Sequence, residues 1–256
     1  MKTLILTALP DIPMIQTGDD LVDIIFKGLA RADIDLHEGD IIAIAQKVVS
    51  KAEGRWVNLK TVEPSLKAIE LGDVVEKDAR LVELILRESK QVLRTRIGTI
   101  IVEHQLGFVC ANAGIDHSNV AGEGAGGNEW VLLLPEDPDN TAQEIRDRLE
   151  ARSGVKLGVL IIDSHGRAWR QGVVGVAIGI AGLPGLVDMR GKNDLFGYTL
   201  RITTIGAGDE LAAAASLVMG QTDEATPIIH VRGFPYRLRD SNLSELLRPK
   251  DQDLFR

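Results

Sequence analysis

The sequence predicts a mixed α/β fold, and three observations support that class. Short apolar runs of strand length alternate along the chain with longer segments whose apolar residues recur at helical spacing. The content of 45% hydrophobic and 26% charged residues is ordinary for a soluble globular protein. No repeat of fixed period and no Pro- or Ser-rich linker divides the 256 residues, which suffice for one large domain or two small lobes with a substantial core.

The elements expected in the first half follow from periodicity and from residues that begin or end helices. Asp19 and Asp20 precede a run of helical period, where acidic side chains favour the positive end of a helix. Pro64 and Gly72 bracket a helix, because proline suits its first turn and glycine its end. We expect a strand at Thr3–Leu9, a helix after Asp20, a buried strand at Asp40–Ala45, a turn or irregular segment at Gln46–Gly54, and helices at Pro64–Gly72 and Asp78–Lys90, the last clearly amphipathic.

The second half continues the alternation. A polar helix is expected to end at Gly154, because glycine favours the left-handed position after a helix. Residues after Tyr236 are polar and charged, which indicates a tail or a peripheral helix. The expected elements are strands at Thr99–Glu103, Phe108–Cys110 and Trp130–Leu134, a helix at Asp137–Ser153, a buried strand at Lys156–Ile162, a strand near Thr199–Ile205, an Ala-rich helix at Asp209–Met219 and a strand at Ile228–Val231.

Charge, cysteine content and the distribution of apolar residues indicate which partners, covalent links and cellular location to expect. The 29 basic and 37 acidic residues give a net charge of −8. Since nucleic-acid binding needs clustered Lys and Arg, this balance disfavours a polyanion, although a local basic pocket can still bind a nucleotide. Cys110 is the single cysteine in the sequence, so no intrachain disulfide can form. The first residues lack the apolar core of a signal peptide, and no run approaches the ~20 apolar residues that cross a bilayer, so we expect a cytoplasmic protein with no membrane partner.

Two acid-bearing segments are the strongest functional signal. Asp116 lies within CANAGIDHSN at 110–119, and Asp163 lies within IIDSHGR at 161–167. Each Asp follows an apolar run and has hydroxyl or amide side chains beside it, which suits Mg²⁺ or Mn²⁺ held against phosphates. The alternatives are an Asx turn at Asp116 and a strand-end cap at Asp163. The five histidines show no H-x-x-x-H spacing, which indicates against a zinc enzyme.

Three glycine-bearing patterns have alternative interpretations. Gly122–Gly127 matches G-x-G-x-x-G, but a dinucleotide fingerprint needs a strand before it and a helix after it, so a flexible ligand-covering loop is favoured. Gly191 and Lys192 do not form a P-loop, because the upstream glycine and the following Ser or Thr of that pattern are absent. The run Gly172–Gly185 permits either close backbone packing or exposed amides for an anion. We favour tight packing there, with a subunit interface as one place for it.

Two basic segments also have two interpretations each. Arg167 and Arg170 follow Asp163 directly, and guanidinium groups suit phosphate or carboxylate oxygens. The alternative is a pair of surface arginines with Trp169 in the core. Lys47 and Lys51 follow a buried strand, where they provide point charges for a phosphate or belong to a solvated turn.

Taken together, these motifs resemble the coenzyme F-420-0:L-glutamate ligase family of gamma-glutamyl ligases. The similarity extends over about residues 3 to 235 in unbroken order. The matching stretches are ALPDI at 8–12, GDD at 18–20, AQKVVSKAEGR at 45–55, LVELILRES at 81–89, GFVCANAGIDHSNV at 107–120, LLLPEDPD at 132–139, DSHGRAWRQGVVGVAIGIAGLPGL at 163–186, DLFGYTLRIT at 194–203, DELAAAASLVMG at 209–220 and VRG at 231–233.

The resemblance implies a fold of mixed sheets with flanking helices, a ligase domain over residues 1–236 with a tail at 237–256, and an intertwined homodimer. It also implies amide ligation driven by GTP, with Mg²⁺ or Mn²⁺ and with K⁺ as a helper. In that chemistry the gamma-phosphoryl group of GTP passes to the lactyl carboxylate of F-420-0. The amine of L-glutamate then attacks the acyl phosphate, and a further cycle adds glutamate through a gamma-linkage.

The resemblance also implies the site residues. Ser164 stands where the family usually has Thr, the role of His165 is open, and the loop Ala121–Asn128 is enlarged. Arg170 is expected at a phosphate or a substrate carboxylate. The implied catalytic residues are Asp116, Asp163 and Arg167; the metal ligands are Asp116, Asp163, Ser164 and Gln221; the nucleotide contacts are Leu9, Pro10, Asp11, Gln46, Lys47, Lys51, Asn119 and the stretch to Thr226 that begins with Met219, Gly220, Gln221, Thr222 and Asp223.

Two other functions stay open at this stage. One is a nucleotide-binding regulator that keeps the pocket without ligating anything. The other is a ligase that uses a different amino acid or a different carboxylated cofactor. The presence of both Asp residues and the flanking arginines disfavours the regulator. A different acceptor stays open, because the sequence does not identify the pocket that binds the amino acid.

Overall fold

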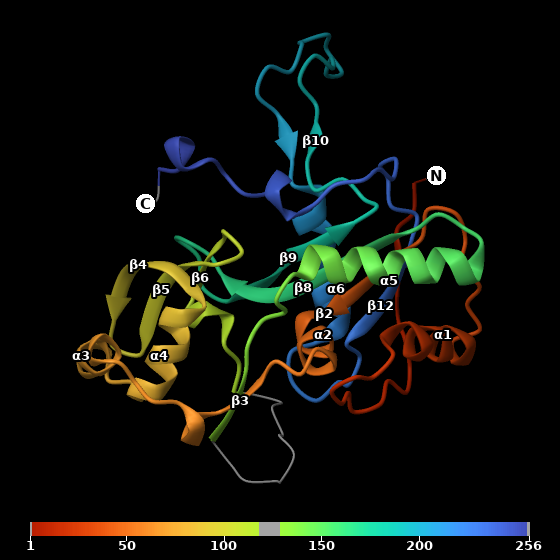
Figure 1. Ribbon diagram of the computed structural model, residues 1–256. Coiled ribbons are helices and arrows are strands. Elements are labelled where there is room, and N and C mark those ends of the chain that lie inside the picture. The colour runs from red at the N-terminus through yellow and green to blue at the C-terminus, as the bar shows by residue number, and fades with distance from the viewer. Residues whose placement is uncertain (1, 118–128, 255–256) are drawn as a thin grey trace.

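The computed structural model describes residues 2–117 and 129–254, and it confirms the predicted mixed α/β class (Figure 1). Five strands form the central sheet. In spatial order they are β1 (Ile5–Ala8), β12 (Ile228–Arg232), β2 (Ile41–Ala45), β8 (Gly158–Gly166) and β9 (Val173–Ala181).

Strand direction decides what this sheet can position. β1 and β2 both pair antiparallel with β12, and β2 pairs parallel with β8. β1, β2 and β8 therefore run the same way, and their last residues lie at one end of the sheet. We call this the carboxyl end of the sheet. In open α/β sheets this is the end where ligands bind.

Helices cover both faces of the central sheet. Alternate residues of β2 face opposite ways, so Ile42 and Ile44 join one apolar cluster while Ile41 and Ala43 join another. The first cluster includes α1 (Leu21–Arg31) and α5 (Pro138–Ser153), and the second includes α6 (Ala207–Met219). Figure 1 shows α5 lying across the sheet. Because both faces are buried, β2 reads as an unbroken apolar run.

A second group of elements lies beside the central sheet (Figure 1). It contributes apolar residues such as Ile85, Ile100 and Val102 to the first cluster, so the two parts share one core. The group consists of β3 (Trp56–Asn58) paired with β7 (Trp130–Leu132), α3 (Leu66–Val75), α4 (Ala79–Arg87), and a sheet of β4 (Ser89–Arg96), β5 (Thr99–His104) and β6 (Val109–Ala111).

The last third of the chain adds an arm and a return segment. β10 (Val187–Asp188) and β11 (Thr204–Ile205) pair at the base of an arm that projects from the rest of the fold (Figure 1). After β12 the chain forms two short 3₁₀ turns, at Leu243–Glu245 and Lys250–Gln252. Leu243 is buried, and the Lys250 ammonium lies 3.0 Å from the Glu103 carboxylate of β5. No described helix is both long enough and apolar enough to span a membrane.

Several predicted elements were wrong in kind or extent. The expected turn at Gln46–Gly54 is helix α2 (Gln46–Ala52), because burial of Val48 and Val49 gives it an inner face that its polar residues conceal in the sequence. The strand expected to end at Ile162 continues to Gly166, since β9 supplies a hairpin partner for the extra residues. The strand expected near Thr199–Ile205 is only two residues long. No strand was predicted at β3, β4 or β9.

The glycine-rich run packs tightly, as predicted, and it does so within the chain. A Cβ added to Gly175 would lie 2.6 Å from the carbonyl oxygen of Ala212 in α6. A Cβ added to Gly179 would lie 2.5 Å from the carbonyl oxygen of Pro138 in α5. A β-bulge in the β8–β9 pairing separates the two glycines, so they face helices on opposite sides of the sheet.

Candidate functional site

Segments far apart in sequence meet at the carboxyl end of the sheet. Leu9 follows β1 and donates its backbone N–H to the carbonyl of Ile228 at 2.9 Å. Ala45 ends β2 and donates to the carbonyl of Pro227 at 2.9 Å. The 219–226 loop therefore arrives at the same end of the sheet as the residues after β1 and β2. The predicted site residues that lie here are Leu9, Pro10, Asp11, Gln46, Lys47, Lys51, Asp163, Ser164 and the stretch Met219–Thr226.

The second group of elements brings Asp116 to this end. Asp116 exchanges two backbone hydrogen bonds with Leu132, the last residue of β7, at 2.9 and 3.0 Å. The loop that leads to it turns at Asn112 and Ala113, whose φ angles are 51° and 53°. This left-handed conformation is uncommon for residues other than glycine and is found at functional sites. The side chain of Asn112 stabilises the turn by accepting the Ile100 N–H at 3.1 Å.

Helix α2 then fixes the Asp116 carboxylate. The Gln46 amide nitrogen donates to Oδ2 of Asp116 at 2.6 Å, and the Lys47 ammonium lies 3.3 Å from Oδ1. The Gln46 amide oxygen in turn accepts the Ser50 hydroxyl at 2.9 Å. Because α2 begins directly after β2, a strand end and a helix start place these side chains without an intervening loop.

The pKa shifts of Asp116 and Lys51 reflect their burial and the charged side chains around them. Burial raises the pKa of Asp116; Lys47 opposes that rise and the charge of Asp163 adds to it. Burial lowers the pKa of Lys51, and Lys47 lowers it further while Asp116 raises it. The Lys51 ammonium also lies 5.6 Å from the ring centroid of Trp56. Two carboxylates and two lysines thus form one electrostatic unit.

Asp163 lies on the Asp116 side of β8. Its Oδ2 is 2.9 Å from Nε2 of His165, two residues along the same face of the strand. The His165 ring packs against Phe108, with ring centroids 5.2 Å apart. Burial, and after it the charge of Asp163, raises the pKa of the Cys110 thiol to about 12, so this cysteine is not a nucleophile. His165 therefore belongs to the site, although the only sequence signal for a role was its position two residues after Asp163.

Ser164 and Gln221 lie on the other side of β8. Alternation along the strand turns Ser164 toward α6, where its hydroxyl is 3.0 Å from the amide oxygen of Gln221. The Gln221 amide nitrogen donates to the Ser216 hydroxyl of α6 at 3.2 Å. The four predicted metal ligands thus form two pairs, one on each face of β8.

The chemistry of the carboxylate pair limits what it can hold. Among residues 2–117 and 129–254, no three or more His, Cys, Asp or Glu side chains are grouped to bind a metal. Asp116 and Asp163 nevertheless fit Mg²⁺ or Mn²⁺, because such cations bind through one or two carboxylates and take their other ligands from water and substrate phosphates. The pair does not fit an ion held by protein ligands alone.

Other predicted site residues lie further from this unit. Arg167 and Arg170 are exposed in the hairpin between β8 and β9, where an Arg167 guanidinium nitrogen lies 3.4 Å from the Gln171 carbonyl oxygen. Trp169 in the same hairpin is 88% exposed, so the interpretation that placed it in the core is wrong. Asn119 and the glycine-rich loop Gly122–Gly127 lie outside the described residues.

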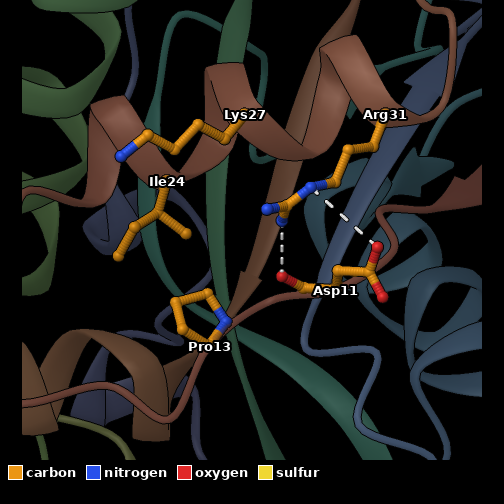
Figure 2. A pocket seen from close by; sticks show the side chains of 5 residues that line it. All are labelled: Asp11, Pro13, Ile24, Lys27 and Arg31. Carbon is orange, nitrogen blue, oxygen red and sulfur yellow. Dashed lines mark hydrogen bonds and ion pairs between the residues drawn. The ribbon is translucent and has the colours of Figure 1, made fainter.

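A small pocket opens where the chain leaves β1 (Figure 2). Its volume is about 210 Å³. Arg31 of α1 donates to the Asp11 carbonyl at 2.8 Å and lies 3.9 Å from the Asp11 carboxylate. The α1 side of this pocket was not predicted; the only sequence signal for it is the i, i+4 spacing of Lys27 and Arg31. The lining residues are Asp11, Pro13, Ile24, Lys27 and Arg31.

Comparisons with known proteins show the family of the chain. The family profile described as F420-0:Gamma-glutamyl ligase matches residues 11–233. The Coenzyme F420:L-glutamate ligase of Methanothermobacter thermautotrophicus is 45% identical over 246 residues, which are 95% of each chain. The protein of that name from Methanopyrus kandleri is 45% identical over 260 aligned residues, covering 100% of this chain and 99% of the relative. The one from Archaeoglobus fulgidus is 38% identical over 96% of this chain and 93% of the relative. The chain therefore belongs to the F420-0:gamma-glutamyl ligase family, and it is a ligase.

Proposed function

We propose that this enzyme uses GTP to join L-glutamate to the coenzyme precursor F-420-0 and then adds glutamate through gamma-linkages. The observation that carries the proposal is the electrostatic unit of two carboxylates, Asp116 and Asp163, and two lysines, Lys47 and Lys51. Relatives that are 36–45% identical bear the name Coenzyme F420:L-glutamate ligase, which supports glutamate as the amino acid and the coenzyme as its acceptor.

The proposed reaction has two chemical steps. The gamma-phosphorus of GTP forms a bond to a carboxylate oxygen of the precursor, and its bond to the GDP oxygen breaks. The glutamate nitrogen then attacks the acyl carbon, the carbon–oxygen bond to phosphate breaks, and the nitrogen loses a proton as the amide forms. Catalysis of the first step depends mainly on positioning and charge stabilisation, which charged side chains at a strand end provide.

Asp116 and Asp163 are the proposed ligands of Mg²⁺ or Mn²⁺, and Ser164 and Gln221 are proposed to contact a second ion from the other face of β8. A bound divalent cation supplies charge stabilisation to the transferring phosphoryl group. The protein's own part is to hold Asp116 through Gln46 and to keep Asp163 beside His165. K⁺ is part of the proposal without an assigned residue.

The lysines and the pocket are the proposed nucleotide contacts. Lys51 is only 9% exposed and lies beside Lys47, so an incoming phosphate would meet two point charges with little competing water. The pocket at Asp11 lies at the same end of the sheet and is proposed to receive the base. Asn119 and the stretch Met219–Asp223 complete the proposed contacts, and Arg167 is proposed to meet a phosphate or a substrate carboxylate.

We also propose a homodimer. The support comes from the arm between β10 and β11, where Leu195, Phe196 and Ile202 are 98%, 96% and 88% exposed. Large apolar side chains that are this exposed favour burial against a second copy of the chain. Sedimentation of the intact chain tests this part of the proposal, and a monomer at micromolar concentration would contradict it.

Phosphate release tests the enzyme reaction. The assay contains GTP, Mn²⁺ and the precursor, with and without L-glutamate. We expect glutamate-dependent release from the wild-type protein and background release from Asp116→Asn. Asp147→Asn, which changes an exposed carboxylate on α5, serves as the matched control and should behave as wild type. GTP binding without glutamate-dependent release would indicate a regulator, and release with another amino acid alone would indicate a different acceptor.

A further inference from the structure

We propose that Ser50 and Gln46 act as a positioning pair that sets the orientation of the Asp116 carboxylate. The inference rests on the proposed function, because it assigns Asp116 to a metal–nucleotide site. The family resemblance implies a nucleotide contact for Gln46, and Ser50 has no role assigned. The pair gives both residues a role that acts through Asp116 and not through the substrate.

The hydrogen bonds run in one direction from the core to the site. The Ser50 hydroxyl, which is completely buried, donates to the Gln46 amide oxygen at 2.9 Å. That bond leaves the Gln46 amide nitrogen to face outward, where it donates to Asp116 Oδ2 at 2.6 Å. Ser50 and Gln46 lie four residues apart on α2, so the helix itself keeps the two side chains adjacent.

The orientation of the Gln46 amide matters because its nitrogen donates hydrogen bonds whereas its oxygen accepts them. If the Gln46 amide were reversed, its oxygen would face Asp116 Oδ2, and two acceptors would meet. The carboxylate, which can only accept, therefore selects the observed orientation, and the Ser50 hydroxyl satisfies the amide oxygen that then faces the core. Gln46 is only 2% exposed, so water offers little substitute for either bond.

Holding Oδ2 leaves Oδ1 as the oxygen that can change partner. Oδ1 faces the Lys47 ammonium at 3.3 Å, and the Lys47 side chain is 30% exposed. A cation that arrives with a nucleotide would therefore find one Asp116 oxygen fixed and the other presented. Residues that orient a metal ligand from behind typically change metal affinity by about 10–100-fold when they are removed.

The test measures Mn²⁺ binding, by electron paramagnetic resonance of free Mn²⁺, in the presence of a non-hydrolysable GTP analogue. Ser50→Ala should raise the Mn²⁺ dissociation constant about tenfold or more, while the KM for L-glutamate stays near wild type. Ser50→Cys, which keeps a weak donor of similar size, should recover part of the loss. Ser153→Ala is the matched control, since its hydroxyl donates to the Leu149 carbonyl at the far end of α5; it should leave Mn²⁺ binding unchanged.

A double-mutant cycle separates positioning from general loss of stability. Gln46→Met removes the amide and keeps the side-chain length, so it should lose Mn²⁺ affinity by itself. Because Ser50 acts only through Gln46, adding Ser50→Ala to Gln46→Met should have no further effect. Gln46→Met alone tests the pair if Ser50→Ala fails to fold.

Each outcome has a distinct meaning. Unchanged Mn²⁺ affinity in Ser50→Ala, or an additive loss in the double variant, would overturn the positioning pair while leaving the proposed function intact. A wild-type protein that binds no Mn²⁺ with the GTP analogue would overturn the proposed function and the positioning pair together.

Discussion

The amide nitrogen of Gln46 lies 2.6 Å from Oδ2 of Asp116, although 70 residues separate them in the sequence. One residue follows a strand of the central sheet, and the other follows the neighbouring small sheet. The contact therefore joins the two parts of the fold at the place where the charged side chains gather.

Asp116→Asn should stabilise the ligand-free protein at neutral pH. Burial and the charge of Asp163 raise the pKa of Asp116 above its unfolded value, so its ionised form costs stability. That cost is present above the folded pKa and disappears below the unfolded pKa, so stability rises as the pH falls through this window. The melting temperature of the variant should exceed wild type at neutral pH and approach it in acid. A lower melting temperature at neutral pH would contradict this account.

Lys47→Met should change two affinities in opposite directions. The Lys47 ammonium faces Asp116 Oδ1, so removing it eliminates a competitor for a divalent cation. Mn²⁺ without nucleotide should therefore bind more tightly, whereas GTP should bind more weakly because a phosphate charge partner is lost. Titration calorimetry measures both, with Lys60→Met, an exposed lysine after β3, as the control. Weaker binding of both ligands would mean that Lys47 does not compete with the cation.

Arg31→Ala should raise the KM for GTP and leave the KM for L-glutamate near wild type. Arg31 holds the Asp11 backbone carbonyl and faces its carboxylate, so its loss should loosen one wall of the small pocket (Figure 2). Steady-state kinetics with each substrate varied in turn make the comparison. Arg190→Ala, on the distant arm, removes an arginine of similar exposure and should alter neither constant. An equal rise in the KM for GTP and the KM for L-glutamate would indicate that Arg31 has only a structural role.

Gly175→Ala should destabilise the fold by about 1–3 kcal/mol, the usual cost of overpacking. Its new methyl group would lie 2.6 Å from both the Ala212 carbonyl oxygen and the Ser216 Cβ, so α6 must shift away from β9. Gly166→Ala is the control, because a Cβ there meets no atom within 4 Å. Chemical denaturation compares the two. Similar stabilities would show that α6 accommodates the added group.

The sequence predicted the strands that reach the site better than it predicted their connections. Asp40–Ala45 and Ile228–Val231 are apolar runs bounded by turn residues, so local pattern sufficed to place β2 and β12. Helix α2 was missed because Gln46, Lys47 and Ser50 look solvated in sequence, yet they point into a site. Gln46 and Lys47 contact Asp116, which is far from them in sequence and which local periodicity does not connect to them.

The two faces of β8 show a second limit of sequence reasoning. Asp163 and Ser164 are adjacent in sequence, which suggested one shared metal site. In the structure β8 continues past Ile162, and its alternation turns the two side chains to opposite faces. That outcome depends on pairing with β9, whose register includes a bulge that no local pattern reveals.

The measurement that tests the central claim most directly is the mass of the product. The protein is incubated with the precursor F-420-0, L-glutamate, Mn²⁺ and GTP, and parallel samples omit GTP or contain Asp163→Asn. We predict a gain of one or more glutamyl units that requires GTP and is absent with Asp163→Asn. An unchanged precursor mass despite GTP binding, or an undiminished gain with Asp163→Asn, would contradict the account.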